Sequence, residues 1–377
     1  MEYIDRGKST ITGKANLESL YVLKDFPVFI GCTDRPRKED LHADMSFAMC
    51  KDTGIIQLDK VLPADIVYSE YHSEALGGVW EEHHKQFADF IHANKPTDIL
   101  EIGGSNGVLA KEYFQSYGIK PWTIVEPNPS PSLRIEKNIN LMERMFDSTF
   151  KFTGKVDTLV HSHTLEHMYE PREFLETIAE FLPIGARHIF SVPNLYEYLK
   201  NKQPNCLNFE HTIFLTEYMI DYLLFQYGFE IEDKKYFRNH SIMYSTKKKA
   251  TPVLFSFQSQ YEEYKELFLD YVQSMKAMVA EFNKRLIKHE GPIYLFGAHV
   301  FSQLFVQFGL DTRRVVAILD NSALKQDKRL YGTDLFVESP DVIRDKDNPL
   351  VILKVGAYQE EVRTQLLRIN PTAIIVE

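Results

Sequence analysis

Residues 98–109 have the sequence DILEIGGSNGVL, an apolar run that ends in an acidic residue and leads through a glycine-rich turn into an amphipathic segment. This pattern predicts a buried β-strand, a tight turn and the start of a helix. Glycines in such a turn let the backbone approach a ligand closely. The spacing differs from the Gly-x-Gly-x-x-Gly pattern of dinucleotide sites, and the carboxylate of Glu101 would repel a pyrophosphate but suit a cationic ligand.

The chain around this stretch divides into four predicted parts. Residues 87–250 alternate short apolar runs with amphipathic stretches, which predicts βα units and a parallel sheet. Residues 1–86 are mixed and predict a small β-containing unit. A helical pattern dominates residues 251–290, and residues 291–377 resume the strand–helix alternation. We therefore expect an α/β protein with a Rossmann-like central domain, a connecting helix and a smaller C-terminal Rossmann-like domain.

Composition excludes several classes of function. The 377 residues carry 43 Lys and Arg against 53 Asp and Glu, a net charge of −10, without the basic face that nucleic acid requires. No stretch approaches the ~20 apolar residues of a membrane span, and the first residues lack the apolar core of a signal peptide. Three cysteines at unequal spacing form no disulfide framework. We expect a cytoplasmic protein with a small-molecule substrate and no nucleic-acid or membrane partner.

A second acidic residue completes the predicted cofactor site. Glu126 follows the predicted strand over residues 122–125, at the position where its carboxylate can accept hydrogen bonds from both hydroxyls of a ribose. S-adenosylmethionine (SAM) is held in this way in Rossmann-like methyltransferases, with the glycine turn under its amino-acid and sulfonium end. The alternative is a plain βα turn in which Glu126 caps the core.

A third strand with a polar end is predicted over residues 156–167, VDTLVHSHTLEH. We expect His161 to face one side of the sheet, capping the strand or reaching solvent, whereas His163, Glu166 and His167 lie beyond its carboxyl end, where open α/β sheets place their sites. For these three, ligand contact and a local hydrogen-bonding role both remain open. The predicted cofactor-binding residues are Glu101, Gly103, Gly104, Ser105, Asn106, Gly107, Glu126, Phe146 and His163.

Several motifs together resemble the sugar C-methyltransferases of deoxysugar biosynthesis over nearly the whole chain. They are Tyr71-His72-Ser73, Glu101 to Gly107, His163 to His167, Val192-Pro193-Asn194, Phe209-Glu210-His211, Pro292 to His299, Asp320-Asn321 and Gly332-Thr333. The resemblance implies an N-terminal zinc-binding unit, a central SAM domain, a C-terminal Rossmann-like domain and a nucleotide-linked sugar as acceptor.

The resemblance also implies the catalytic and substrate-binding residues. His211 is the expected general base, with Glu210 and Tyr71 as further catalytic residues. Glu210 would point away from His211 in an extended segment, so its help in orienting His211 requires a turn, and Tyr71 has packing as its alternative. The family has Tyr and His where this chain has Asn208 and Phe209. The expected substrate-binding residues are His167, Asn194, Asn208 and His299.

The zinc site of the resembling enzymes is incomplete in this sequence. Cys32 and Cys50 are each the single member kept of two Cys-x-x-Cys pairs, and His42 lies between them. Two thiolates do not complete the four-ligand tetrahedron of structural zinc. We therefore expect no metal, and burial of both cysteines as small apolar residues.

The sequence thus predicts a SAM-dependent methyltransferase acting on a nucleotide-linked sugar. The alternatives are an O- or N-methyltransferase of another polar or phosphorylated small molecule, and a non-catalytic scaffold that binds SAM or a sugar nucleotide. An NAD-dependent oxidoreductase is the least favoured, because the spacing of the glycine turn is wrong for it.

Overall fold

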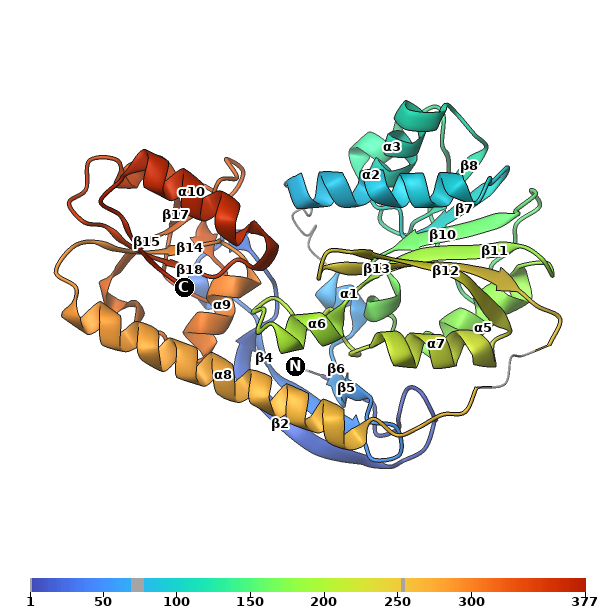
Figure 1. Cartoon of the computed structure of the whole chain (residues 1–377), viewed down its shortest axis with the longest axis horizontal. Helices are drawn as coiled ribbons and strands as arrows, with labels where there is room; N and C mark the ends of the chain where they lie inside the picture. The colour runs from blue at the N-terminus through green and yellow to red at the C-terminus, as the bar shows by residue number, and fades with distance from the viewer. Residues whose placement is uncertain (1, 69–77, 252–254) are drawn as a thin grey trace.

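The computed structural model describes residues 2–68, 78–251 and 255–377. Figure 1 shows a central sheet with helices on both faces, a second sheet beside it, and one long helix that runs below the second sheet and alongside the N-terminal strands. None of the helices in the described part of the chain has the length and apolarity that a membrane span needs.

The central sheet has seven strands. They are β7 (Ile99–Ile102), β8 (Trp122–Val125), β9 (Asn140–Met142), β10 (Thr158–Ser162), β11 (Arg187–Pro193), β12 (Phe229–Phe237) and β13 (Ser241–Lys248). Their order across the sheet is β12-β13-β11-β10-β7-β8-β9, and only β13 runs antiparallel to its two neighbours. The five parallel strands follow the order 3-2-1-4-5 of a doubly wound sheet, which confirms the predicted Rossmann-like α/β fold. Because the order reverses between β7 and β10, ligands are expected at the carboxyl ends of these two strands.

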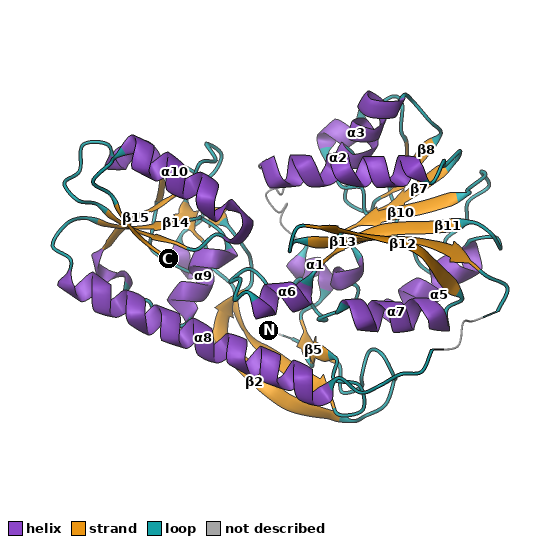
Figure 2. Cartoon of the chain, viewed as in Figure 1, coloured by secondary structure: helices purple, strands orange, loops and turns teal. Residues whose placement is uncertain are grey.

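Helices cover both faces of this sheet, as Figure 2 shows. One face carries α2 (Gly78–Ala93) and α3 (Val108–Tyr117), and the other carries α5 (Pro171–Phe181) and α7 (Glu217–Gln226). Apolar residues repeat at helical spacing in α5, where Phe174, Leu175 and Ile178 are buried. Short helical segments occupy the connections: α4 (Pro131–Arg134), the 3₁₀ turn η2 (Leu165–His167) and α6 (Leu195–Lys200).

The N-terminal part forms small antiparallel sheets. Strands β2 (Leu17–Pro27), β4 (His42–Cys50) and β5 (Ile56–Leu58) form one sheet, and β1 (Ile4–Asp5) pairs with β6 (Lys60–Val61). The 3₁₀ turn η1 (Arg37–Glu39) and α1 (Ala64–Val67) complete this part. The ring of Phe47 in β4 lies 5.9 Å from that of Phe214 and 5.1 Å from that of Phe268, so three parts of the chain share one core.

The C-terminal part is a second, entirely parallel sheet. Its five strands are β14 (Ile293–Phe296), β15 (Val315–Leu319), β17 (Val337–Glu338), β18 (Leu350–Leu353) and β19 (Ile374–Val376), in the order β17-β15-β14-β18-β19. It also contains α9 (Val300–Gln307), α10 (Gln359–Ile369) and the 3₁₀ turns η3 (Thr312–Arg314), η4 (Pro340–Ile343) and η5 (Gly356–Tyr358). The predicted connecting helix is present as α8 (Tyr261–Lys288), which buries one apolar face against the other parts.

The N-terminal and C-terminal parts are joined by a short sheet and an ion pair. Strand β3 (Cys32–Thr33) pairs with β16 (Arg329–Leu330). The guanidinium of Arg329 donates to both carboxylate oxygens of Asp40, each at 2.7 Å, and both side chains are buried. Such a bidentate pair fixes orientation as well as distance.

Candidate active site

The glycine turn lies against the loop that follows β10. Gly103 has a φ of +73°, and a Cβ at this position would lie 3.0 Å from Oγ1 of Thr164. Glycine is therefore required both by the backbone conformation and by the close approach of the second loop. The turn and the loop meet at the reversal of strand order, which is where a ligand is expected.

Glu126 is held at this turn by backbone hydrogen bonds. Its Oε2 accepts from the amide of Ser105 at 3.0 Å, and its Oε1 accepts from the amide of Asn128 at 2.8 Å. Each carboxylate oxygen can accept a further hydrogen bond, because it has two lone pairs. Asn106 lies in the turn just before α3, where its Oδ1 accepts from the amide of Val108 at 3.2 Å.

Glu101 forms the floor of the same turn. It is buried, and its Oε2 accepts a hydrogen bond of 2.8 Å from Nε1 of Trp122. Burial raises the pKa of Glu101 to about 7, and the charge of Glu126 adds to this effect while the bond from Trp122 opposes it. Among the described residues, none forms an ion pair with Glu101 or Glu126. Two buried acids without a cationic partner from the protein suit a positively charged ligand, so the residues present fit SAM.

Two further predicted cofactor residues, Phe146 and His163, have different surroundings. Phe146 packs into a group of aromatic rings, with centroid distances of 4.9 Å to Phe150 and 5.7 Å to Phe181. His163 has a φ of +49° and lies in the loop after β10. Its Nε2 is 2.9 Å from Oγ of Ser241, and its ring centroid is 4.8 Å from that of Trp80. Contact of Phe146 and His163 with SAM stays a prediction.

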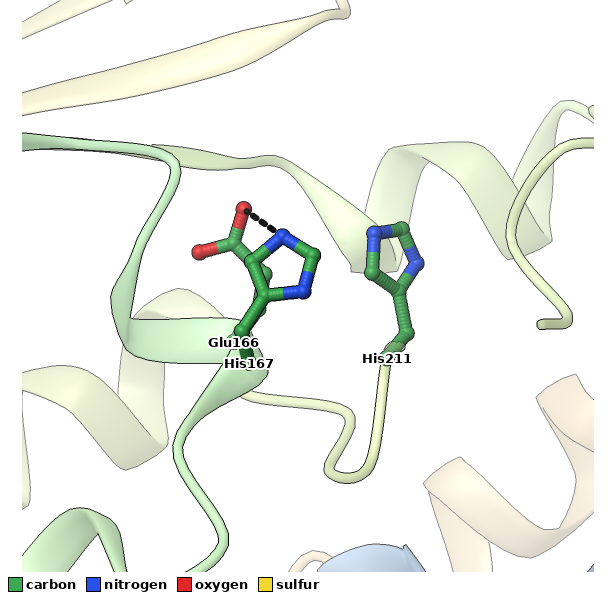
Figure 3. Close-up of side chains that lie close together, drawn as sticks. All are labelled: Glu166, His167 and His211. Atoms are coloured by element: carbon green, nitrogen blue, oxygen red, sulfur yellow. Dashed lines mark ion pairs between the residues drawn. The ribbon is translucent and has the colours of Figure 1, made fainter. Parts of the chain in front are cut away.

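A second group of polar side chains lies beyond the β10 loop. Figure 3 shows the imidazole of His167 beside the carboxylate of Glu166, with the ring of His211 across from them. One potential ligand atom from each of these residues lies within 4.8 Å of the others. Glu166 has 1% of its side chain exposed, and neither of its oxygens accepts a hydrogen bond from a described residue. These residue types can also bind a divalent cation, so removal of metal is a necessary control for any activity.

The loop that carries His211 is fixed from two sides. Oδ1 of Asn208 accepts the amides of Glu210 at 2.9 Å and His211 at 2.8 Å, which closes a turn. The next residues pair with β5, because the amide of Leu58 donates to the carbonyl of Thr212 at 2.9 Å. The turn that the sequence argument required between Glu210 and His211 is therefore present. The carboxylate of Glu210 lies 4.0 Å from Nδ1 of His167.

His211 is a neutral imidazole at neutral pH. Burial lowers its pKa to about 4, and neighbouring His167 lowers it further, whereas the charges of Glu166 and Glu210 act in the opposite direction. Its Nδ1 lies 3.3 Å from the carbonyl oxygen of Cys206 and 3.2 Å from Nδ2 of Asn208. If Nδ1 carries the proton and donates to this carbonyl, Nε2 is free to accept one.

The other predicted substrate residues lie in turns and at a helix start, and their contact with a substrate stays a prediction. Asn208 is buried and its described contacts lie within the His211 loop. Asn194 caps α6, with Oδ1 accepting from the amide of Glu197 at 3.3 Å. His299 lies in the turn between β14 and α9. Tyr71 lies outside the described residues.

Some residues of the site were missed or misplaced by sequence reasoning. The hydroxyl of Tyr68 lies 3.4 Å from Nδ1 of His167, and no sequence signal distinguished it from the neighbouring aromatic residues. The expectation that His161 caps the strand or reaches solvent was wrong. It is fully buried, with Nε2 2.9 Å from Nε2 of His188, because the register of β10 and β11 places both rings inside the sheet packing.

Of the two cysteines of the incomplete zinc pattern, Cys50 is buried as expected, whereas Cys32 is only half-buried. Cys32 packs against the C-terminal cluster, whereas Cys50 belongs to the cluster shared by the N-terminal part and the central domain. Burial raises the pKa of the Cys32 thiol to about 12, which disfavours the thiolate that zinc requires. We predict that metal analysis of the purified protein shows no stoichiometric zinc. One zinc per chain would contradict this.

Comparison with known proteins agrees with the geometry of the central domain. Residues 74–234 match the family model of a methyltransferase domain. None of the curated proteins matches the sequence. Among solved structures, 1,6-didemethyltoxoflavin-N1-methyltransferase of Burkholderia thailandensis is 17% identical, with 54% of this chain and 96% of that chain covered and a TM-score of 0.40. Human N-acetylserotonin methyltransferase, solved with SAM, is 17% identical, with 46% and 53% covered and a TM-score of 0.39.

The central part of the chain is a methyltransferase domain, and the protein is a SAM-dependent methyltransferase. The prediction of this enzyme class and of SAM as cofactor is confirmed. The comparisons do not extend to the sugar C-methyltransferase family, which rests on the sequence motifs alone.

Proposed function

We propose that this enzyme transfers the methyl group of SAM to a nucleotide-linked sugar, with His211 as the general base. The observation that carries the proposal is the His211 loop. It holds a half-buried, neutral imidazole beside Glu166 and His167, which lie in the loop after β10 whose Thr164 contacts the glycine turn. A neutral imidazole in this position is able to take the proton that an acceptor must lose.

Different residues of the chain have different roles in the proposed reaction. When bound, SAM supplies an electrophilic sulfonium methyl. His211 accepts a proton at Nε2 in the tautomer whose Nδ1 carries a proton and faces the carbonyl of Cys206. The nearby carboxylate of Glu166 stabilises the imidazolium that forms. For a keto sugar the proton comes from the carbon beside the carbonyl and leaves an enolate, whereas for an alcohol it comes from the hydroxyl.

The C-terminal sheet is well situated for contacts with the acceptor. Tyr358, which follows β18, packs against both the C-terminal core and the core of the central domain. A Cβ at Gly356 would lie 3.5 Å from Oε1 of Gln203, three residues before Cys206. The turn that carries His299 follows the neighbouring parallel strand β14 and so lies at the same edge of this sheet. Contact of His299 with the nucleotide-linked part of the acceptor is consistent with this position.

The altered residues before Glu210 leave the methylated atom open. Phe209, which replaces a histidine of the resembling family, is buried with its ring centroid 6.2 Å from that of Phe26. Asn208 shapes the turn of the His211 loop. Since both residues serve packing or backbone structure here, O- or N-methylation of a polar small molecule is the second candidate.

The proposal is tested by incubating the purified enzyme with labelled SAM and a panel of nucleotide sugars, followed by mass analysis of the products. We expect one acceptor to gain a single methyl group, and the fragmentation pattern to show whether it is on carbon, oxygen or nitrogen. The same assay with EDTA controls for a metal at Glu166, His167 and His211, and the activity is expected to persist. Methylation only of acceptors without a sugar would overturn the proposed substrate class.

A further inference from the structure

A continuous row of polar groups leads away from the proposed base towards the surface. Oε1 of Glu166 lies 3.3 Å from Nδ1 of His163. Nε2 of the same histidine lies 2.9 Å from Oγ of Ser241, and this oxygen lies 2.6 Å from Nδ1 of His240. Ser241 is fully buried, whereas 9% of the surface of His240 is exposed. The row therefore runs from the side chain of Glu166, which is 1% exposed, to the β12–β13 turn, and both of its histidines reach solvent in part.

Three separate elements bring these groups together. His163 follows β10, Ser241 begins β13, and His240 belongs to the turn between β12 and β13. Trp80 of α2 covers the row, with its ring centroid 4.8 Å from that of His163 and 4.9 Å from that of His240. The side chain of His163 keeps 16% exposure beside this cover.

Both histidines of the row are neutral at neutral pH. Burial lowers the pKa of each to about 3. A neutral imidazole accepts a hydrogen bond at one nitrogen and donates at the other, and a serine hydroxyl does both, so the three groups can form a chain with one direction. The titratable or charged groups that surround the row are His83 and His84 of α2, Arg238 of the β12–β13 turn, Tyr198 of α6, and His167.

We propose that Glu166, His163, Ser241 and His240 form a proton relay that carries the proton released by methyl transfer from the active site to solvent. This inference rests on the proposed function, because the proton enters from His211. The nitrogen of His211 and the carboxylate of Glu166 lie within 4.8 Å, a separation that one bridging water molecule spans.

In the relay, each group that gains a proton on one side gives up a proton on the other. The carboxyl group of protonated Glu166 is not hydrogen-bonded to His163 in the resting structure, so it first turns its O–H towards Nδ1 of His163, 3.3 Å away, and then gives up the proton. Nε2 of His163 gives its own proton to Oγ of Ser241. The hydroxyl proton of Ser241 passes to Nδ1 of His240, and Nε2 of His240 releases a proton to solvent or buffer. One proton enters at Glu166 and one leaves at His240, so the charge of the row is unchanged.

The test removes the middle link with Ser241→Ala. We expect turnover in dilute buffer to fall at least about tenfold, with the KM for SAM unchanged, and to recover when a small buffer such as imidazole is added at high concentration. The matched control is Ser245→Ala, which removes an equally buried hydroxyl on the same strand that bonds Oδ1 of Asn94 instead. It should lower turnover little, and added buffer should not change it.

A second measurement does not depend on turnover. NMR of protein labelled at histidine should show that Ser241→Ala changes the signals of Nε2 of His163 and Nδ1 of His240, whereas Ser245→Ala leaves them unchanged. The relay would be overturned if the Ser241→Ala variant turned over as fast as the wild type in dilute buffer. It would also be overturned if the variant lost turnover and no added buffer restored it. The failure of the proposed function is a separate result: either no sugar nucleotide is methylated, or His211→Asn is as active as the wild type.

Discussion

Replacement of His211 by asparagine is expected to lower the turnover of methyl transfer by ~10²–10⁴, the usual contribution of a general base. Asparagine keeps the approximate size and some hydrogen bonding of histidine but has no group that accepts a proton. SAM affinity, measured by calorimetry, should be unchanged, because the glycine turn and Glu126 are untouched. A matched control is His92→Asn. The ring of His92 stacks on that of Tyr117, with the two centroids 3.7 Å apart, and both lie away from the site, so its loss should not affect the rate.

The pH profile distinguishes catalysis by His211 from a structural role. The wild-type rate should rise with pH as His211 loses its proton, and because burial lowers its pKa to about 4, this rise should be complete before neutral pH. The Asn variant should lack the rise. Asn208→Asp places a carboxylate beside Nδ1 of His211, so it should raise this pKa and move the rise to higher pH. A His211→Asn enzyme with full rate per folded molecule and an unaltered profile would exclude this base, and His163 or His167 would be tested next.

Replacement of Glu126 by alanine is expected to lower the affinity for SAM at least tenfold with the fold intact. The variant loses a carboxylate that can accept from two ribose hydroxyls, and a hydrogen bond to a charged group is worth about 1.5–3 kcal/mol. It also releases the amide of Ser105, which bonds Glu126 at 3.0 Å, so a looser turn contributes to the loss. Calorimetric titration with SAM measures the change.

A cofactor analogue separates these two contributions. Wild-type enzyme should bind S-adenosylhomocysteine more tightly than an analogue without the ribose hydroxyls, and Glu126→Ala should lose this preference. Glu143→Ala is the control. Glu143 is an exposed acid that follows β9, the strand next to β8, and its carboxylate lies 3.0 Å from the guanidinium of Arg134. Unchanged SAM affinity in Glu126→Ala would exclude this residue from the ribose site.

Much of the central domain follows from local sequence. The strand, glycine turn and helix of residues 98–109 are adjacent in the chain, so their pattern needs no distant partner to be recognised. The same holds for Glu126 at the end of β8 and for the long apolar stripe of α8, where side chains repeat at the helical period. These features are sufficient to predict a Rossmann-like α/β domain and SAM as its ligand.

The surroundings of His211, the proposed base, were decided by the tertiary structure. Ser241 and His240 meet His163 only because β13 inserts antiparallel between β11 and β12, a pairing that no local pattern specifies. His211 faces Glu166 because its loop pairs with β5, more than 150 residues earlier in the chain. Sequence periodicity determines which faces of helices and strands are buried, whereas strand order and packing determine which distant polar groups become neighbours. The sequence alone therefore determined the fold and the cofactor of this protein, and the folded chain decided which histidines surround the proposed site and how each is protonated.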